Sequence, residues 1–590
     1  IPNPSVVMEA YMDTPLVNGA AYPYMQVEPK AYRFRILNAA NDRFWNLQLY
    51  EANPDIRTAD GRTNTEVKMV PAADGRDGGM PDPQTAGPSF IQIGTEGGFL
   101  PAPAVIDNKP ITYDNMGNVE DHTLLLGCAE RADVIVDFSQ YEGKTLILYN
   151  DAPAGFPGGD PRFDYYTDDL DQTSTGGTPS TKAGYGPNTR TIMQIKVANT
   201  RSDSQPIAAY DLDALNAAFA KTDTKRGVFE KGQDPILVPQ AAYNSAYNSN
   251  FPDQYVKQQD NSLTFQTLSG ESVTIPLQQK AIQDSMPDAY DLDYGRMKGF
   301  IGLQLPATAG TDYVMYPYTS PPVTIIKDSK VIGQPLAMAS DGTQIWKFTH
   351  NGMDTHPVHV HLFNAQLINR LNMDGKILPP DANELGWKET FRMNPMEATI
   401  VALRPTAPTN QPFDVPNVVR SIDPSMPDGV ELTGPPGGYK DPQGNPVTVV
   451  NHKVNYGWEY IYHCHILGHE ENDMMVATIF AVAPRPPTDL TIKGNSGKLS
   501  WKDNSISETG FTIQRAEDPN FTVGLTTFKV GPNVVTYSDT TTQKNKRYYY
   551  RVQANNVVGD TYNYPAPSVG FPTVSADSVF SNTVTTPVPG

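Results

Sequence analysis

Side chains that could bind a metal gather at two places in the sequence. Six of the nine histidines lie in two short segments, HPVHVH at 356–361 and YHCHILGHEENDMM at 462–475, and the second segment also carries one of the two cysteines. The candidate ligands are His356, His359, His361, His463, Cys464, His465, His469 and Met474. Imidazole, thiolate and thioether groups together select copper over hard cations. The two segments therefore predict a copper protein.

Residues 463–465 can serve two different metal sites if they form an extended strand. Alternate side chains of a strand point to opposite faces. His463 and His465 would then share one face, while Cys464 would point to the other. We therefore expect one site on each side of this segment.

The side that receives the cysteine has a complete ligand set for a blue-copper centre. Such a centre takes two histidines and one cysteine in a plane, with a long axial bond to a methionine. The candidates are His356, Cys464, His469 and Met474. The alternative is a structural zinc site, but those usually repeat cysteine at short spacing, and no second cysteine lies near Cys464.

With these ligands the sequence resembles the C-terminal domain of a multicopper oxidase, for which the HCHxxxHxxxxM pattern is a specific signature. Other segments resemble the bacterial spore-coat laccase group. They are LVNG at 16–19, VEPKAYRFRILNAAN at 27–41, IQIGTEGGFLP at 91–101, ERADVIVDF at 130–138 and GWKET at 386–390. The resemblance covers roughly residues 1–483, with long insertions.

The resemblance implies a role for each ligand. The type 1 copper, which accepts electrons from substrate, would be bound by His356, Cys464, His469 and Met474. The oxygen-reducing site would use His359 for the type 2 copper and His361, His463 and His465 for the type 3 pair. Cys464 and His469 would take part in catalysis, because the electron donor would meet the outer edge of His469 and the covalent path from Cys464 to its two flanking histidines would carry electrons between the sites. Glu470 would help to deliver protons to oxygen, although it could also be a solvated acid.

The sequence has only half of the histidines that this family uses to reduce oxygen. The trinuclear cluster of the family takes eight histidines as four HxH pairs, and this chain has two pairs. His122, His350 and His452 are isolated, and we expect them to be surface or hydrogen-bonded residues. Because the sequence begins where the second domain of the family would, we expect a separate polypeptide, a cupredoxin domain with two HxH motifs, to supply the other ligands.

Short apolar segments with strand-like alternation predict an all-β fold. The clearest lie at 32–37, 133–138, 145–149, 191–197, 398–403 and 475–482, and the best helical candidate is 207–222. We expect two cupredoxin-like domains, each a β-sandwich with Greek-key connections, at 1–200 and 201–483. The second would carry the type 1 copper and half of the trinuclear site.

The last part of the chain is expected to be a separate domain, 484–590. The proline cluster PRPPT at 484–488 predicts the boundary, because such a cluster cannot lie in a central strand. Beyond it, LSW at 499–501, GFTIQRA at 510–516 and RYYYRVQANNVVG at 547–559 resemble a fibronectin type III β-sandwich. Tyr548 would be its corner tyrosine.

Composition restricts the partners and the location of the protein. The net charge of -20 argues against a nucleic-acid partner, since phosphate binding requires a positive surface. No stretch approaches the roughly 20 apolar residues of a membrane helix. A fibronectin-like module and the use of copper and oxygen favour an extracellular, cell-surface or periplasmic location. A homo-oligomer or a surface assembly is a further expectation.

Two other features of the sequence are expected to have no role in the proposed chemistry. Cys128, flanked by apolar residues, is expected to be a small core residue. The acidic run that contains Asp164, Asp168, Asp169 and Asp171 is expected to be a solvated loop, with binding of manganese or iron ions as the alternative.

The favoured hypothesis is the large chain of a laccase-like oxidase. It would oxidise phenols, aromatic amines or metal ions by single electrons and couple this to four-electron reduction of O2 to water. The alternative is an extracellular blue-copper electron-transfer or filament-forming surface protein that never reduces oxygen. A structural β protein with relict histidines is the third hypothesis.

Overall fold

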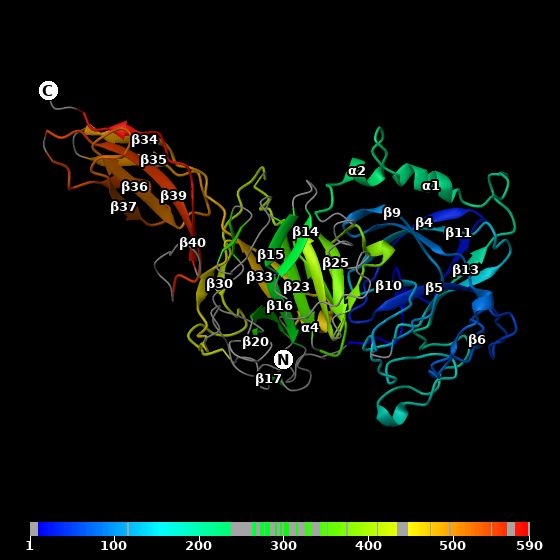
Figure 1. The fold of residues 1–590 in the computed structure, drawn as a ribbon. Helices are drawn as coiled ribbons and strands as arrows, with labels where there is room; N and C mark the ends of the chain where they lie inside the picture. The colour runs from blue at the N-terminus through cyan, green and yellow to red at the C-terminus, as the bar shows by residue number, and fades with distance from the viewer. Residues whose placement is uncertain are drawn as a thin grey trace. The chain divides into compact units, whose positions relative to one another are not determined.

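The computed structural model of the chain consists mainly of β-strands and loops, which confirms the predicted all-β class (Figure 1). The structure describes residues 10–114, 117–237, 343–350, 352–372, 376–409, 411–432, 446–472, 474–494, 497–543, 545–562 and 573–587, together with short strands between 262 and 332. Unit 1 comprises residues 1–315, 345–403 and 463–475, and unit 2 comprises residues 316–344, 404–462 and 476–590. The domain boundaries predicted at 200 and 483 stay predictions.

Unit 1 begins with a β-sandwich. One sheet has the order β10 (Leu124–Leu126), β5 (Trp45–Glu51), β12 (Thr145–Asn150), β13 (Thr191–Val197) and β3 (Tyr24–Val27), and the other has β4 (Ala31–Leu37), β11 (Arg131–Asp137), β8 (Phe90–Thr95) and β9 (Gly98–Ile106). Leu49 and Leu146 from the first sheet share a core with Phe90 and Val134 from the second. Four predicted strands correspond to β4, β11, β12 and β13.

A second set of strands in unit 1 carries the first histidine segment. Here β16 (Gln278–Gln283), β23 (Gln344–His350), β29 (Glu397–Leu403), β25 (Ala365–Asn372) and β26 (Ile377–Leu378) are neighbours in that order. Beside them in sequence, β24 (His356–Val360) pairs antiparallel with β28 (Thr390–Met393), and His356 lies opposite Met393. The predicted strand 398–403 falls within β29, which is buried along its whole length.

The predicted helix at 207–222 is shorter in the structure, where α1 spans Leu212–Phe219. The side chain of Asp211 accepts a hydrogen bond from the backbone N–H of Ala214 and caps the helix, so the preceding residues are left outside it. Phe219 packs into a cluster with Ile91 and Ile135, which explains where the helix ends. Among the described helices, none is long and apolar enough to cross a membrane.

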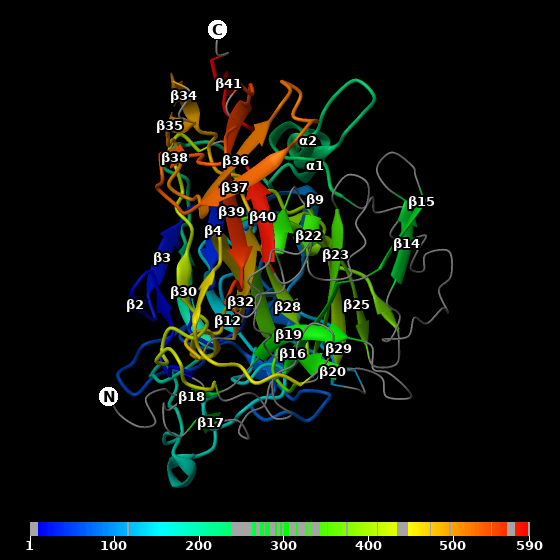
Figure 2. The same ribbon diagram turned by 90° about the vertical axis from the view of Figure 1, so that its left-hand side faces the viewer.

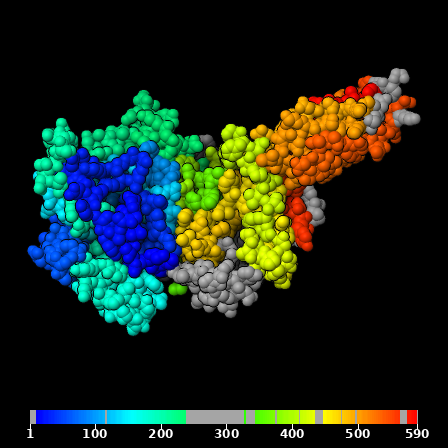
Figure 3. Space-filling view, turned by 180° about the vertical axis from the view of Figure 1, so that it is seen from behind, coloured from blue at the N-terminus to red at the C-terminus, as the bar shows by residue number. Residues whose placement is uncertain are grey.

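The C-terminal part of unit 2 is a second kind of sandwich, which we call the C-terminal module. One sheet contains β34 (Thr488–Lys493), β35 (Lys498–Lys502) and β38 (Thr536–Ser538), and the other contains β37 (Thr526–Val530), β36 (Gly510–Ala516), β39 (Tyr549–Gly559), β40 (Thr573–Asp577) and β41 (Val584–Thr585). Trp501 and Ile513 pack in their shared core with Tyr550 and Val552. Figure 2 shows β36, β39 and β40 side by side, and the module forms the orange and red surface of Figure 3.

Within unit 2 the C-terminal module is fused to the strands that precede it. Val558 and Ala576 of the module share a buried cluster with Tyr456 and Ile479, the latter from β33 (Met475–Phe480), and the predicted strand 475–482 corresponds to β33. The segments before and after the predicted boundary at 484–488 therefore bury one common core.

This shared core predicts that the stability of unit 2 depends on Val558. We expect Val558→Asp to lower the melting temperature by about 10 °C or to prevent folding, because an unpaired charge would replace a wholly buried side chain. Val579→Asp is the matched control, since Val579 is 72% exposed. Thermal unfolding followed by circular dichroism makes the comparison, and equal melting temperatures would show that the core is not shared.

Candidate metal centre

The two histidine segments meet in unit 1. The first lies on β24, and the second begins at the end of β32 (Trp458–Cys464) and continues into the single-turn helix α4 (Leu467–Glu470). The backbone N–H of His465 donates to the carbonyl oxygen of Pro357 over 2.8 Å. This bond holds the two segments against each other at the position of the predicted ligands.

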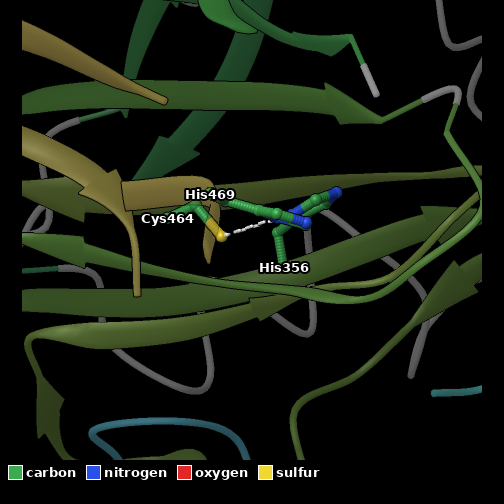
Figure 4. A group of neighbouring side chains, drawn as sticks. All are labelled: His356, Cys464 and His469. Atoms are coloured by element: carbon green, nitrogen blue, oxygen red, sulfur yellow. Dashed lines mark hydrogen bonds between the residues drawn. The ribbon is translucent and has the colours of Figure 1, made fainter. Parts of the chain in front are cut away.

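Three of the predicted ligands form a closed triangle (Figure 4). The Nδ1 atom of His356 is 3.3 Å from the Cys464 sulfur, the sulfur is 3.6 Å from Nδ1 of His469, and the two Nδ1 atoms are 3.2 Å apart. Metal–nitrogen bonds of about 2.0 Å and a metal–sulfur bond of about 2.3 Å in one plane would separate such ligands by roughly 3.5 Å. The triangle therefore fits a trigonal metal ion, and all three residues are buried.

The pKa values of the two cysteines are shifted in opposite directions. Burial alone would raise the pKa of Cys464, but the neighbouring His356 and His469 lower it to about 7. A thiol with this pKa readily gives the thiolate that metals bind. Burial raises the pKa of Cys128 well above its ordinary value, and Cys128 is 1% exposed, as expected for a core residue.

Met474 lies next to this triangle in the chain fold. Its carbonyl oxygen accepts a hydrogen bond from the N–H of Cys464 over 3.1 Å, and its own N–H donates to the carbonyl oxygen of His469 over 3.0 Å. Its side chain is wholly buried. The main chain of Met474 is thus fixed to two of the three ligands in the triangle.

The remaining histidines gather on the other side of the segment 463–465. The ligand atoms of His359, His361 and His463 all lie within 4.8 Å of one another, and the Nε2 atoms of His361 and His463 are 3.1 Å apart. The ring of His465 is 5.2 Å from that of His463. The predicted alternation is therefore present, since Cys464 points to one group of ligands and its two neighbours point to the other.

Hydrogen bonds leave the metal-binding nitrogens of this group available. Nδ1 of His359 is 3.0 Å from the carbonyl oxygen of Glu389, and Nδ1 of His463 is 3.0 Å from that of Cys464. A carbonyl can only accept, so each Nδ1 carries the proton and each Nε2 keeps its lone pair. Burial lowers the pKa of His359 to about 3 and that of His463 to about 4. Both rings are thus neutral at neutral pH, as metal binding requires.

Buried charges hold the strand that supports His359. Lys388, next to Glu389, places its ammonium 2.9 Å from Glu96 and 3.1 Å from Glu130, and all three side chains are nearly unexposed. Glu96 also accepts a hydrogen bond from the N–H of Glu389 over 3.3 Å. These three residues lie in the segments 91–101, 130–138 and 386–390, but nothing in the sequence shows that the segments meet. Their contact joins the first sandwich to the strands around β28.

Glu470 lies beside the histidine group but makes no tight contact with it. Its Oε2 atom is 3.5 Å from Nδ1 of His463 and 3.8 Å from Nδ1 of His465, and its side chain is 32% exposed. A partly exposed carboxylate this close to two histidines is placed where a proton could pass from the solvent to this group.

The three histidines outside the two segments differ from one another. His122 contacts Asp381 over 2.9 Å and His452 contacts Asp560 over 2.9 Å, so both are hydrogen-bonded, as expected. His350 is hydrogen-bonded as well, since its Nδ1 atom lies 3.2 Å from the carbonyl oxygen of Met393. Unlike the other two, it also lies beside a proposed ligand, because its ring centre is 4.8 Å from that of His356.

The acidic run is a loop, as expected, but only part of it is solvated. Asp164 lies 3.5 Å from the buried guanidinium of Arg43, and Asp169 accepts a hydrogen bond from the N–H of Thr181 over 2.6 Å. Asp168 and Asp171 are exposed. In the described part of the chain these four carboxylates therefore do not converge on one metal-binding position.

Comparison with known proteins points to copper oxidases. A family model described as multicopper oxidase matches residues 317–412, which include the first histidine segment. The chain is 24% identical to a laccase of Bacillus subtilis strain 168 over 489 residues, which is 80% of this chain and 56% of that protein. It is 25% identical to a laccase of Bacillus stratosphericus over 479 residues, with the same two coverages.

Among solved structures, the McoA multicopper oxidase of Aquifex aeolicus is similar with a TM-score of 0.38 and 18% identity, over 81% of this chain and 61% of that chain. The chain thus spans little more than half the length of the curated laccases that it matches. The ligand geometry, the family model and the curated relatives together support the multicopper oxidase family, a family of copper-dependent oxidoreductases, for this chain.

Proposed function

We propose that this chain carries the electron-accepting site of a laccase-like multicopper oxidase. The proposed enzyme oxidises phenols, aromatic amines or metal ions one electron at a time and reduces O2 to water. The observation that carries the proposal is the buried triangle of His356, Cys464 and His469, which adjoins a second histidine group through the backbone of residues 463–465. Bound copper would supply the one-electron redox chemistry at both places.

The resemblance to multicopper oxidases implies a role for each ligand in these two groups. The type 1 copper would be held by His356, Cys464, His469 and Met474, the type 2 copper by His359, and the type 3 pair by His361, His463 and His465. Cys464 is covalently joined to both of its histidine neighbours, so electrons would have a short path through bonds. Glu470 would hold a proton at Oε2, next to the site of oxygen reduction.

The other four histidines of the trinuclear cluster would come from outside these 590 residues. Of the nine histidines in the chain, His122, His350 and His452 lie away from the half-cluster and cannot complete it. The proposed source is a further cupredoxin polypeptide that supplies two HxH pairs. The matched laccases extend beyond the region that they share with this chain, and the two further HxH pairs would lie in a segment of that kind.

A second candidate is an electron-transfer protein that keeps the type 1 copper and never reduces oxygen. It is favoured by one observation: within the described residues, the triangle is complete, whereas the second group has only four histidines. The two candidates differ in copper content and in oxygen consumption.

We further propose that the C-terminal module is of the fibronectin type III kind and that the protein works outside the cytoplasm. The three-strand sheet β34, β35, β38 facing β37, β36, β39 supports the first point. So does Tyr548, whose hydroxyl accepts a hydrogen bond from the N–H of Gln543 over 3.4 Å, as a corner tyrosine does. Neither the kind of C-terminal module nor the location of the protein alters the proposed copper chemistry.

The proposed cluster predicts the copper content of the native material. The purified 590-residue chain should bind one type 1 copper and consume no oxygen, whereas the assembled enzyme should contain about four coppers and consume oxygen with a phenol as donor. Metal analysis and an oxygen electrode measure both quantities. One copper and no oxygen uptake in native material would favour the electron-transfer candidate instead.

The ligand triangle predicts the origin of the blue colour. Cys464→Ser should lose the copper–thiolate absorption band and one bound copper, because a serine hydroxyl does not replace the thiolate. Cys128→Ser is the matched control and should stay blue, since Cys128 is buried outside the triangle. A Cys464→Ser protein that remained blue would refute the assignment.

The lowered histidine pKa values predict how stability depends on pH in the copper-free protein. Folded His463 takes up a proton only near a pKa of about 4, whereas an unfolded histidine does so near 6.5. Between these values the unfolded state binds more protons, so this histidine makes the free energy of unfolding rise with pH. We expect His463→Asn to flatten the rise between about pH 4.5 and about pH 6.5 in denaturant titrations. An unaltered slope in His463→Asn would contradict the pKa shift.

A further inference from the structure

A turn of the first sandwich contacts the residues just before the copper ligand His469. This turn, Asn38–Arg43, follows β4 and lies against the start of α4 in unit 1. The N–H of Leu467 donates to the carbonyl oxygen of Asn41 over 3.0 Å, and the N–H of Gly468 donates to the Asp42 carboxylate over 3.4 Å. Two consecutive backbone amides before His469 are thus held by the other sandwich.

The turn is itself tightly fixed, so it can position what it contacts. The side-chain amide of Asn38 donates to the carbonyl oxygens of Arg43 and Leu126, each over 2.9 Å. The buried guanidinium of Arg43 donates to the carbonyl oxygen of Phe163 over 2.8 Å. Because buried polar groups satisfied in this way resist displacement, the turn is a rigid support.

Asp42 brings a carboxylate into this buried contact. It is 2% exposed, and its second oxygen accepts a hydrogen bond from the backbone N–H of Ala10. Backbone N–H donors stabilise a carboxylate in its charged form, even where burial opposes the charge. The thiol of Cys128 donates to the neighbouring Asn41 carbonyl oxygen over 3.4 Å, and the pKa of Cys128 is raised by burial, then by Asp42 and then by Cys464.

We propose that Asp42 is a positioning residue of the type 1 site, which holds the turn before His469 and lowers the reduction potential of the bound copper. A nearby negative charge stabilises the oxidised, more positive ion over the reduced ion. A lower potential favours electron transfer onward to the oxygen-reducing site and makes the copper a weaker oxidant of the donor. This inference rests on the proposed function, because it assigns regulation to the same copper site.

The test compares Asp42→Asn with the wild type in two states. In the copper-loaded chain, a redox titration of the copper–thiolate band should give a higher midpoint potential for Asp42→Asn. In the copper-free chain, hydrogen exchange at the Gly468 amide should become about tenfold faster, because a hydrogen bond to a neutral group is weaker than one to a charged group. A purely structural role would change exchange alone.

Asp151→Asn is the matched control. Asp151 is also buried and accepts a backbone N–H, that of Ile111, over 2.8 Å, but it lies in a different hydrogen-bonded group, with Asn46. Its variant should keep the wild-type potential and the wild-type exchange at Gly468. An unchanged potential in Asp42→Asn, or an equal shift in both variants, would overturn the proposal.

If Asp42→Asn does not fold, Asp42→Glu is the variant that tests the proposal. It keeps the charge but lengthens the side chain, so the potential should stay near that of the wild type while exchange at Gly468 accelerates. Unchanged exchange would overturn the proposal. If the wild-type chain shows no copper–thiolate band at all, the proposed function fails, and hydrogen exchange in the copper-free variants still reports whether Asp42 holds this turn.

Discussion

The alternation of side chains along an extended strand determines where both proposed copper sites can lie. At the end of β32, Cys464 points to His356 and His469, whereas His463 points to His359 and His361. Because adjacent residues are covalently linked, the two groups of ligands can be separated only by the width of one strand. In the proposed enzyme, an electron accepted by the buried triangle would therefore have a route to the second group that no loop movement can lengthen.

The fixed separation of the two groups can shape the proposed sites only if the other ligand residues are also held in place. The first sandwich provides much of this support. Lys388, Glu96 and Glu130 form a buried ion network behind the backbone that accepts the hydrogen bond of His359. Burying charges costs free energy unless each is paired, and here the lysine has two partners. The turn Asn38–Arg43 supports the opposite end of the site, next to His469. Support from two directions orients the ligands before any metal binds.

The ligands and most strands could be predicted because their signals are local. The period of two fixes which side chains share a face, and the spacing HPVHVH and HCH needs no knowledge of the fold. Long-range contacts could not be predicted. Asp164 and Asp169 were taken for solvated residues, yet Arg43 and Thr181, distant in sequence, draw them into the interior. The contact between the rings of His350 and His356 is another example, because the sequence does not show that two successive strands bring them together.

The most direct test of the central claim is to locate copper relative to residues 463–465. Crystals of the copper-loaded protein would be measured at the copper absorption edge, and the anomalous difference map would show each metal position. The account predicts copper on both sides of this segment, with Cys464 bound on one side and His463 on the other. A single copper position touching both residues, or copper remote from Cys464, would contradict it.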